Sequence, residues 1–228
     1  MTDRRYNPIY SIPEVAAYLH IQPATLRSWV LGRSYKTRAG EKRFSEPLIL
    51  IADSKTKTMS FINLIEAHVL SAIRKAHNVP MHNIRPALQH LSEKYGVNHP
   101  LAEYDLLTDG LDIFINECNS LISVNRQGQI ALRPILTGYL SRITRDDKGI
   151  PARLFPFPTP GMAEIQANEK ENLFVIDFSV AFGRRLVNGT GVPVDEIIDR
   201  VEAGESLDSI AEDFEIDKKK LEAVISAA

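Results

Sequence analysis

The sequence predicts a mainly α-helical protein with a small β component. Two segments near opposite ends, 11–30 and 206–225, have apolar residues at the spacing of a helix-turn-helix. Runs typical of strands are short and lie between these two segments. These patterns predict a winged helix-turn-helix over residues 1–50, an α+β middle region over 51–157, a linker over 158–172, and a three-helix, helix-turn-helix-like domain over 173–228.

The first helix is predicted to begin after Ser11. Ser11 and Glu14 have the spacing of a capping box, in which each side chain accepts a hydrogen bond from the other residue's backbone N–H. Pro23 suits the first position of a second helix, whose Leu26 and Val30 are expected to point inward. The outer face of the second helix would then carry Thr25, Arg27 and Ser28, with Trp29 on or near it.

A basic, glycine-punctuated segment, 32–43, follows the second helix and is predicted to form a hairpin or wing. A short strand is expected after it, over 47–51. In a winged helix-turn-helix the second helix contacts bases and phosphates, and the wing holds flanking phosphates. The predicted DNA-binding residues are therefore Thr25, Arg27 and Ser28 on the helix, and Arg33, Lys36, Arg38, Lys42 and Arg43 on the wing.

The middle region mixes helical and strand patterns. It is predicted to contain helices over 61–76, 83–95 and 134–143, and strands over 111–116 and 121–124. Pro86 is placed in the first turn of its helix, where a missing N–H costs nothing. Four prolines and a polar stretch then mark the linker. Beyond it we expect a strand over 174–177, a glycine-containing turn over 183–191, and helices over 194–202, 206–214 and 217–227.

The two ends of the chain carry opposite charge. Residues 1–46 hold eight Lys and Arg against four Asp and Glu, whereas residues 191–228 hold four against eleven. Because phosphate binding depends on Lys and Arg, the first helix-turn-helix is predicted to bind DNA. The acidic second one is expected to serve assembly or to hold a basic partner.

The whole-chain composition is that of an ordinary globular protein, with 44% hydrophobic and 25% charged residues. Cys118 is the only cysteine, which argues against a disulfide framework or zinc ribbon and fits a reducing compartment. The sequence has neither an N-terminal signal peptide pattern nor an apolar run long enough for a membrane span. We therefore expect a cytoplasmic protein without membrane contact.

Residues 10–29 resemble the N-terminal helix-turn-helix of MerR-type regulators. The matching elements are Tyr-Ser-Ile at 10–12, an alanine in the first helix, and Thr-Leu-Arg-x-Trp at 25–29. The basic stretch that ends in Lys-Arg-Phe at 42–44 resembles the wing of that family. One departure is His20, which stands where the family often has a turn glycine. The turn is then expected to be strained, although His tolerates left-handed geometry better than most residues.

From Phe174 onward the chain resembles a domain-of-unknown-function family grouped with VapB-type antitoxins. The motifs that match are Ile-Asp at 176–177, Phe-Gly-Arg at 182–184, Gly-Thr-Gly at 189–191, Val-Pro-Val at 192–194, Ala-Gly-Glu-Ser at 203–206 and Ile-Ala-Glu-Asp-Phe at 210–214. Arg185 replaces a proline that is common in that family. Stretches of the middle region resemble its full-length members, so the resemblance covers nearly the whole chain. It implies a DNA-binding antitoxin whose partners are operator DNA and a PIN-like ribonuclease toxin.

No catalytic or metal site is expected. Four histidines of one region match no known ligand spacing: His77, His82, His90 and His99. A metal-dependent nuclease is a weak third possibility, which would use the acidic residues Asp105, Asp109, Asp112 and Glu117. The sequence thus predicts a homodimeric, non-enzymatic antitoxin and autoregulator that needs no cofactor or metal. The alternative is a protein-interaction scaffold that does not bind DNA.

Overall fold

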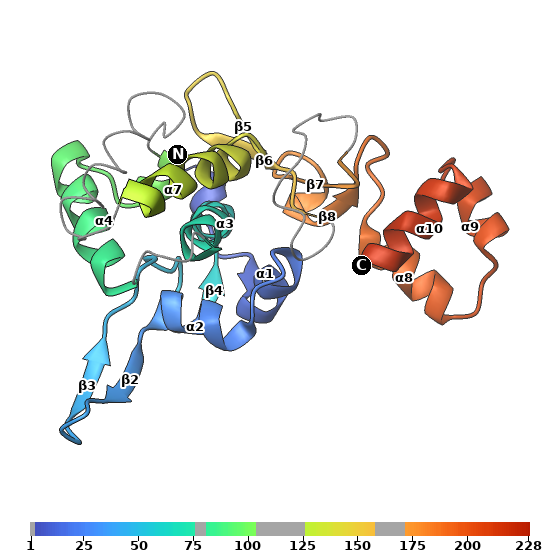
Figure 1. Cartoon of the computed structure of the whole chain (residues 1–228). Helices are drawn as coiled ribbons and strands as arrows, with labels where there is room; N and C mark the ends of the chain where they lie inside the picture. Colours follow the sequence, from blue (N-terminus) through green and yellow to red (C-terminus); the bar gives the residue numbers. More distant parts are fainter. Residues whose placement is uncertain (1–2, 76–80, 104–125, 158–171) are drawn as a thin grey trace.

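The computed structural model describes residues 3–75, 81–103, 126–157 and 172–228 (Figure 1). The predicted strands over 111–116 and 121–124, Cys118 and all but the last residue of the predicted linker lie outside these residues. The mainly α-helical class with a small β component is confirmed.

The N-terminal part begins with a short 3₁₀ helix, η1 (Arg4–Tyr6). Strand β1 (Tyr10–Ser11) pairs antiparallel with β4 (Thr58–Met59). This pairing joins the two ends of the segment that contains the helix-turn-helix and the wing. Between these strands lie α1 (Ile12–Tyr18), α2 (Pro23–Leu31), β2 (Arg33–Lys36) and β3 (Lys42–Ser45). The capping box of Ser11 and Glu14 is present, and Pro23 opens α2, so both predicted start signals are confirmed.

Helix α3 (Phe61–Lys75) is the centre of the main core. Its residues are buried from position 61 to position 73, because α5 (Pro100–Glu103) and α7 (Arg126–Leu140) pack against it, together with η1. Figure 1 shows α3 in the middle of the larger lobe, with α4 (Met81–Tyr95) beside it. A helix that is buried on all sides must satisfy its few polar side chains internally. The hydrogen bonds of Asn63, described below, meet this requirement.

A four-stranded antiparallel sheet links the middle region to the C-terminal region. Its order is β5 (Ile143–Arg145), β6 (Pro151–Leu154), β7 (Phe174–Asp177) and β8 (Arg185–Val187). The first two strands precede the predicted linker in sequence and the last two follow it. Leu154 pairs with Ile176 at the centre of the sheet, so the two regions share hydrogen-bonded backbone.

The C-terminal helices are α8 (Val194–Glu202), α9 (Leu207–Asp213) and α10 (Lys218–Ala227). They enclose a small core of their own and form a lobe opposite the wing in Figure 1. Ser206 caps α9 and Asp217 caps α10, since each side chain accepts backbone N–H bonds of the first turn. The three predicted helices are therefore confirmed.

The strand predicted over 47–51 does not form. The backbone N–H groups of Leu48 and Ile49 donate instead to the carbonyl oxygen of Trp29, at 2.7 and 3.1 Å. The side-chain amide of Asn63 donates to the carbonyl oxygen of Leu50 at 2.8 Å and accepts a hydrogen bond from the N–H of Ala52 at 2.9 Å. These tertiary partners replace a strand ladder, which a short apolar run alone could not reveal.

Three further boundaries differ from the sequence prediction. Helix α4 begins at Met81, so Pro86 lies inside the helix and not in its first turn. Helix α7 begins at Arg126, contains Pro134 and ends at Leu140, after which Ile143 starts a strand. The predicted turn over 183–191 contains strand β8. Proline and glycine mark breaks only as preferences, and packing overrode them here.

Candidate nucleic-acid interface

The second helix of the helix-turn-helix, α2, separates cleanly into an inner and an outer face. Leu26 and Val30 are buried as predicted, but Trp29 is only 3% exposed and belongs to the core, not to the outer face. The backbone carbonyl oxygen of Trp29 also accepts hydrogen bonds from the N–H groups of Leu48 and Ile49, in the loop after the wing. An indole this deeply buried stabilises the domain and contributes nothing to the outer surface.

The predicted helix residues lie on the outer face in different degrees. Arg27 is exposed, whereas Thr25 and Ser28 are half-buried. The hydroxyl of Ser28 donates to the carbonyl oxygen of Thr25 at 2.7 Å, so it is left to act as an acceptor. Arg27 is therefore the side chain of α2 with the longest reach toward a nucleic acid.

The wing is a regular two-stranded hairpin that projects from the body beyond α2 (Figure 1). Lys36 pairs directly with Lys42, and Tyr35 pairs directly with Arg43. Because opposed residues of an antiparallel pair point to the same face, Lys36 and Lys42 share one face. Arg33 and Arg43 share the other face, and Arg38 lies in the turn between the strands. The structure thus brings two of the five predicted wing cations, Lys36 and Lys42, side by side. The three wing arginines lie on the other face or in the turn.

The facing lysines are unfavourable in the isolated protein. Like charges directly opposite each other destabilise a strand pair. Among the described residues, no carboxylate lies within ion-pair distance of either lysine, whereas Arg43 is paired with Glu41 at 3.1 Å. That exposed pair contributes little to stability. An anion between Lys36 and Lys42 would remove their repulsion.

The base of the wing is held in a fixed position. Gly32, with φ of 71°, lets the backbone turn from α2 into β2, and an added Cβ would lie 2.5 Å from the carbonyl oxygen of Ser45. Arg85 of α4 donates to the carbonyl oxygen of Pro47 at 2.7 Å and to the hydroxyl of Ser45 at 3.1 Å. Two contacts therefore position the base of the wing: the close approach of Gly32 to Ser45, and the hydrogen bonds of Arg85 to Ser45 and Pro47.

The turns of the two helix-turn-helix segments have the same backbone geometry. His20 has φ of 51° and Glu215 has φ of 52°, and each follows the last residue of a preceding helix by two positions. The left-handed geometry expected at His20 is present. Its ring Nε2 lies 3.0 Å from the carbonyl oxygen of Phe157, which ties the turn to the end of the middle region.

Two of the three lysines of the C-terminal helix-turn-helix, Lys218 and Lys220, are engaged within their own lobe. Lys218 forms an ion pair with Asp208 at 2.5 Å, and Lys220 donates to the carbonyl oxygen of Asn188 at 2.5 Å. Arg200 pairs with Glu205 and with Asp213. These contacts, with the surrounding acidic residues, leave this lobe poorly suited to phosphate.

The buried side chains of Glu66 and His99 are hydrogen-bond partners of each other. Glu66 lies 2.8 Å from Nδ1 of His99, and burial raises the pKa of the Glu66 carboxyl. Burial opposes a charged His99, but the hydrogen bond that its ring donates to Glu66, together with the negative charges of Glu66 and Glu103, outweighs burial and raises the pKa of His99. Within the described ranges, no three His, Cys, Asp or Glu residues lie close enough together to hold a metal ion. Five of the eight histidines and acids singled out in the sequence lie outside those ranges: His77, Asp105, Asp109, Asp112 and Glu117.

Helices of the described ranges are also too short or too polar to cross a lipid bilayer.

Comparison with known proteins agrees with this organisation. Residues 8–88 match a family described as "Putative DNA-binding HTH domain", and residues 175–227 match "Protein of unknown function (DUF433)". The chain is 27% identical to "Putative antitoxin VapB45" of Mycobacterium tuberculosis over 96% of its own length and 93% of that protein. Neither family description names the MerR-type regulators, so that part of the resemblance stays a prediction.

A solved structure extends the likeness to three dimensions. The X-ray crystal structure of Rv2018 from Mycobacterium tuberculosis superposes with a TM-score of 0.66 at 26% identity, and the match covers 97% of this chain and 98% of that one. The chain is thus similar over nearly its full length to a protein named "Putative antitoxin VapB45", and it matches the "Putative DNA-binding HTH domain" family near its N-terminal end and DUF433 near its C-terminal end.

Proposed function

We propose that this protein is a DNA-binding antitoxin that represses its own promoter. The observation that carries the proposal is the pair of facing lysines, Lys36 and Lys42, on a wing that projects beyond α2, whose Arg27 is exposed. A DNA phosphate between the two lysines would turn a repulsive contact into an attractive one. The relative named as an antitoxin and the matched DNA-binding family support the same conclusion.

The proposed site comprises all the cations and hydroxyls predicted from the sequence. Arg27 contacts base edges or phosphates in the major groove, with Thr25 and Ser28 as short polar contacts at its side. The wing residues Arg33, Lys36, Arg38, Lys42 and Arg43 hold phosphates on both sides of the hairpin. A recognition helix of nine residues reads few base pairs, so we propose that the protein binds as a homodimer to two half-sites.

Fluorescence anisotropy with DNA from upstream of the gene tests the proposal. We expect Arg27→Glu and the double variant Lys42→Glu/Arg43→Glu to weaken binding at least tenfold. Lys148→Glu is the matched control, because it reverses one exposed charge on the β5–β6 hairpin, away from the wing (Figure 1). Equal binding by all variants would overturn the proposed interface.

We further propose that the C-terminal lobe holds a basic toxin, a ribonuclease of the PIN type. Eleven acidic residues against four basic ones over residues 191–228 complement a surface evolved to bind RNA. Co-expression with the product of the neighbouring gene tests this. A stable complex that keeps that product from degrading RNA would support the pairing, and independent elution of the two proteins would contradict it.

Exposed aromatic residues on the wing favour one competing function. Tyr35 is 44% exposed and Phe44 is 53% exposed, and such side chains are enriched where proteins bind other proteins. A protein-interaction scaffold that uses the wing would bind a protein partner and show no affinity for DNA even at low salt. The same anisotropy titration therefore separates the two functions.

A further inference from the structure

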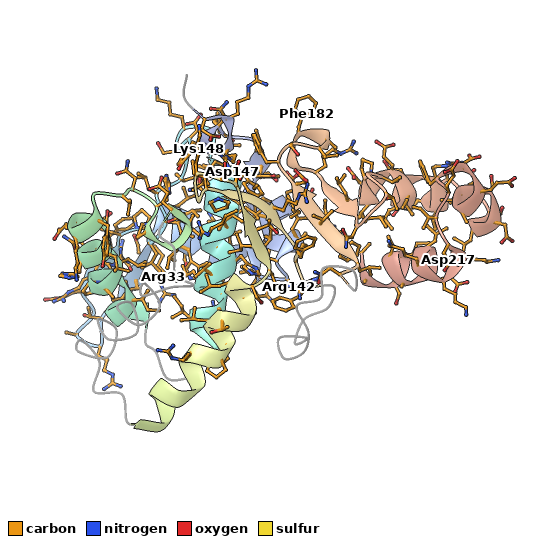
Figure 2. All side chains as sticks on the ribbon, turned by 90° about the horizontal axis from the view of Figure 1, so that it is seen from above. Arg33, Arg142, Asp147, Lys148, Phe182 and Asp217 are labelled. Atoms are coloured by element: carbon orange, nitrogen blue, oxygen red, sulfur yellow. The ribbon has the colours of Figure 1, made fainter. Side chains whose placement is uncertain are left out.

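The loop between β7 and β8 exposes a large apolar side chain. Phe182 is 87% exposed, and Figure 2 shows its ring standing clear of the ribbon. Ile9 and Val180 beside it are 39% and 38% exposed. We call these three residues the Phe182 patch. An isolated exposed leucine or valine needs no explanation, but a fully projecting phenylalanine among other apolar side chains is typical of an interaction site.

The backbone beneath this patch is strained. Ala181, Phe182 and Gly183 have φ values of 46°, 55° and 80°. The left-handed region suits glycine or asparagine, and a bulky side chain there is disfavoured. The loop nevertheless keeps this geometry, because the hydroxyl of Tyr10 binds the carbonyl oxygen of Gly183 and the N–H of Gly183 binds the carbonyl oxygen of Val180. Both the strain and the exposed ring are unfavourable in a free monomer.

An open hollow of about 550 Å³ lies directly beside the projecting ring. Phe182 and Ala181 form part of its rim, and the remainder is lined by Arg4, Asn7, Ile9, Phe178 and Ser179. Arg4 supplies the only charge of this lining. A guanidinium beside apolar side chains favours an aromatic occupant, because the face of an aromatic ring attracts a cation.

We infer that two copies of this chain associate through the Phe182 patch around a two-fold axis. In a two-fold interface both copies use the same surface, so that surface must be complementary to itself in shape and chemistry. Here an aromatic projection and a hollow suited to an aromatic ring lie next to each other on one face. Each Phe182 enters the hollow of the other copy, where Arg4 of that copy lies over the ring.

This inference rests on the proposed function, which requires two helix-turn-helix units on one operator. Arg4, Asn7 and Ile9 immediately precede β1, and Tyr10 of β1 holds the loop that carries Phe182. The interface is therefore continuous with the DNA-binding unit, and it would fix the distance between the two recognition helices. Half-site spacing follows from that distance.

Sedimentation velocity without DNA tests the inference on the full-length protein and on Phe182→Asn. We expect the unchanged protein to be a dimer and the variant to dissociate about 100-fold more readily, since two buried rings are lost per dimer. Asparagine is preferred to phenylalanine at φ near 55°, so the variant should unfold at the same or a higher denaturant concentration. Leu50→Asn is the control, because Leu50 is 62% exposed outside the patch and should leave the dimer intact.

A second measurement follows the burial of position 182 directly. The chain has one tryptophan, Trp29, which is buried in both states. In Phe182→Trp the added indole should shift its emission to shorter wavelength as the protein concentration rises through the dimer range. An emission maximum that does not change while the dimer forms would overturn the inference.

Failure of this inference can be told apart from failure of the proposed function. A monomeric unchanged protein, or a Phe182→Asn variant that dimerises normally, overturns the inference and assigns the patch to a different protein partner. DNA affinity is measured separately with the wing variants. Dissociation of Phe182→Asn together with absence of any DNA binding would uphold the dimer interface and reject the DNA-binding function.

Discussion

The hydroxyl of Tyr10 donates a 2.7 Å hydrogen bond to the carbonyl oxygen of Gly183, which lies 173 residues further along the chain. Burial raises the pKa of Tyr10, so this hydroxyl stays protonated at any physiological pH. A second tyrosine of the helix-turn-helix, Tyr18, lies edge-on to it at 6.3 Å between ring centroids and donates to Glu14 at 3.1 Å. The helix-turn-helix unit and the start of the C-terminal region are thereby locked together.

Removing the Tyr10 hydroxyl should destabilise the whole protein. In Tyr10→Phe the buried carbonyl of Gly183 loses its partner, which lowers the free energy of unfolding by about 1–2 kcal/mol. Urea denaturation measures the change. Tyr35→Phe is the control, because Tyr35 is exposed on the wing and its hydroxyl should not matter. Equal stability of the two variants would show that the contact between Tyr10 and Gly183 contributes nothing.

The two equivalent turns should respond differently to glycine. Glu215 is exposed, so Glu215→Gly removes left-handed strain with no lost contact and should stabilise the protein by about 0.5–1 kcal/mol. His20→Gly removes the same strain but also the contact of the ring with the carbonyl oxygen of Phe157. Its net effect should be near zero or destabilising. Thermal unfolding of both variants checks this ordering, and a larger gain at His20 would contradict it.

The buried pair of Glu66 and His99 should give stability a measurable pH dependence. The pKa of His99 is raised in the folded state, so the stabilisation is complete below its ordinary value of about 6.5 and declines as the pH rises through the raised pKa. Glu103 contributes to the raised pKa of His99, and Asn63 hydrogen-bonds Glu66. Glu66→Gln removes the main partner of the imidazolium.

Urea denaturation of the unchanged protein and of Glu66→Gln between pH 5.5 and 8.5 tests this pH dependence. The range extends about one pH unit below and two above an ordinary histidine pKa. The difference in the free energy of unfolding should be largest at the acidic end and should shrink toward the alkaline end. A difference that grows with pH would contradict the assignment of a charged His99.

Arg142 should be essential for joining the two halves of the four-stranded sheet. Its guanidinium donates to the carbonyl oxygens of Phe155 and Pro156 and, at 2.6 Å, to the side chain of Asn172, and burial lowers its pKa to about 10. Arg142→Ala leaves these buried acceptors unpaired and should cost about 2–4 kcal/mol. Arg38→Ala at an exposed position of the wing turn is the comparison, and the free energy of unfolding of each variant is the readout.

The facing lysines should each contribute measurably to the salt dependence of DNA binding. Lys36→Gln and Lys42→Gln each remove one phosphate contact, which lowers the slope of log affinity against log salt by about 0.9. Neither substitution should reduce stability, because each one relieves repulsion between the strands. Lys148→Gln should leave the slope unchanged. Slopes that are identical in all three variants would place the phosphates elsewhere.

Much of the helix-turn-helix architecture could be predicted because its signals are local. The capping box of Ser11 and Glu14, the proline that opens α2 and the left-handed His20 each depend on residues within four positions of one another. The same holds for two of the C-terminal helices, α9 and α10, which Ser206 and Asp217 cap. The eight predicted DNA-binding residues follow from these elements, and their contacts with DNA stay predictions.

Other features depend on partners far away in sequence, and no local pattern indicated them. Trp29 is buried in the main core, and its carbonyl oxygen binds the loop after the wing, where a strand was expected over 47–51. Pro86 and Pro134 lie inside helices that begin earlier than their prolines suggested. In each case the packing of a whole element outweighs the preference of one residue.

The sequence by itself determined the helix-turn-helix segments, their caps and turns, and the separation of charge between the two ends, because these depend on periodicity and on hydrogen bonds between near neighbours. Only the tertiary structure decided that Lys36 faces Lys42, that Tyr10 holds Gly183, and that Phe182 projects beside a hollow. Strand register and contacts between residues more than a hundred positions apart are set by how complete elements pack, and sequence spacing carries no record of that packing.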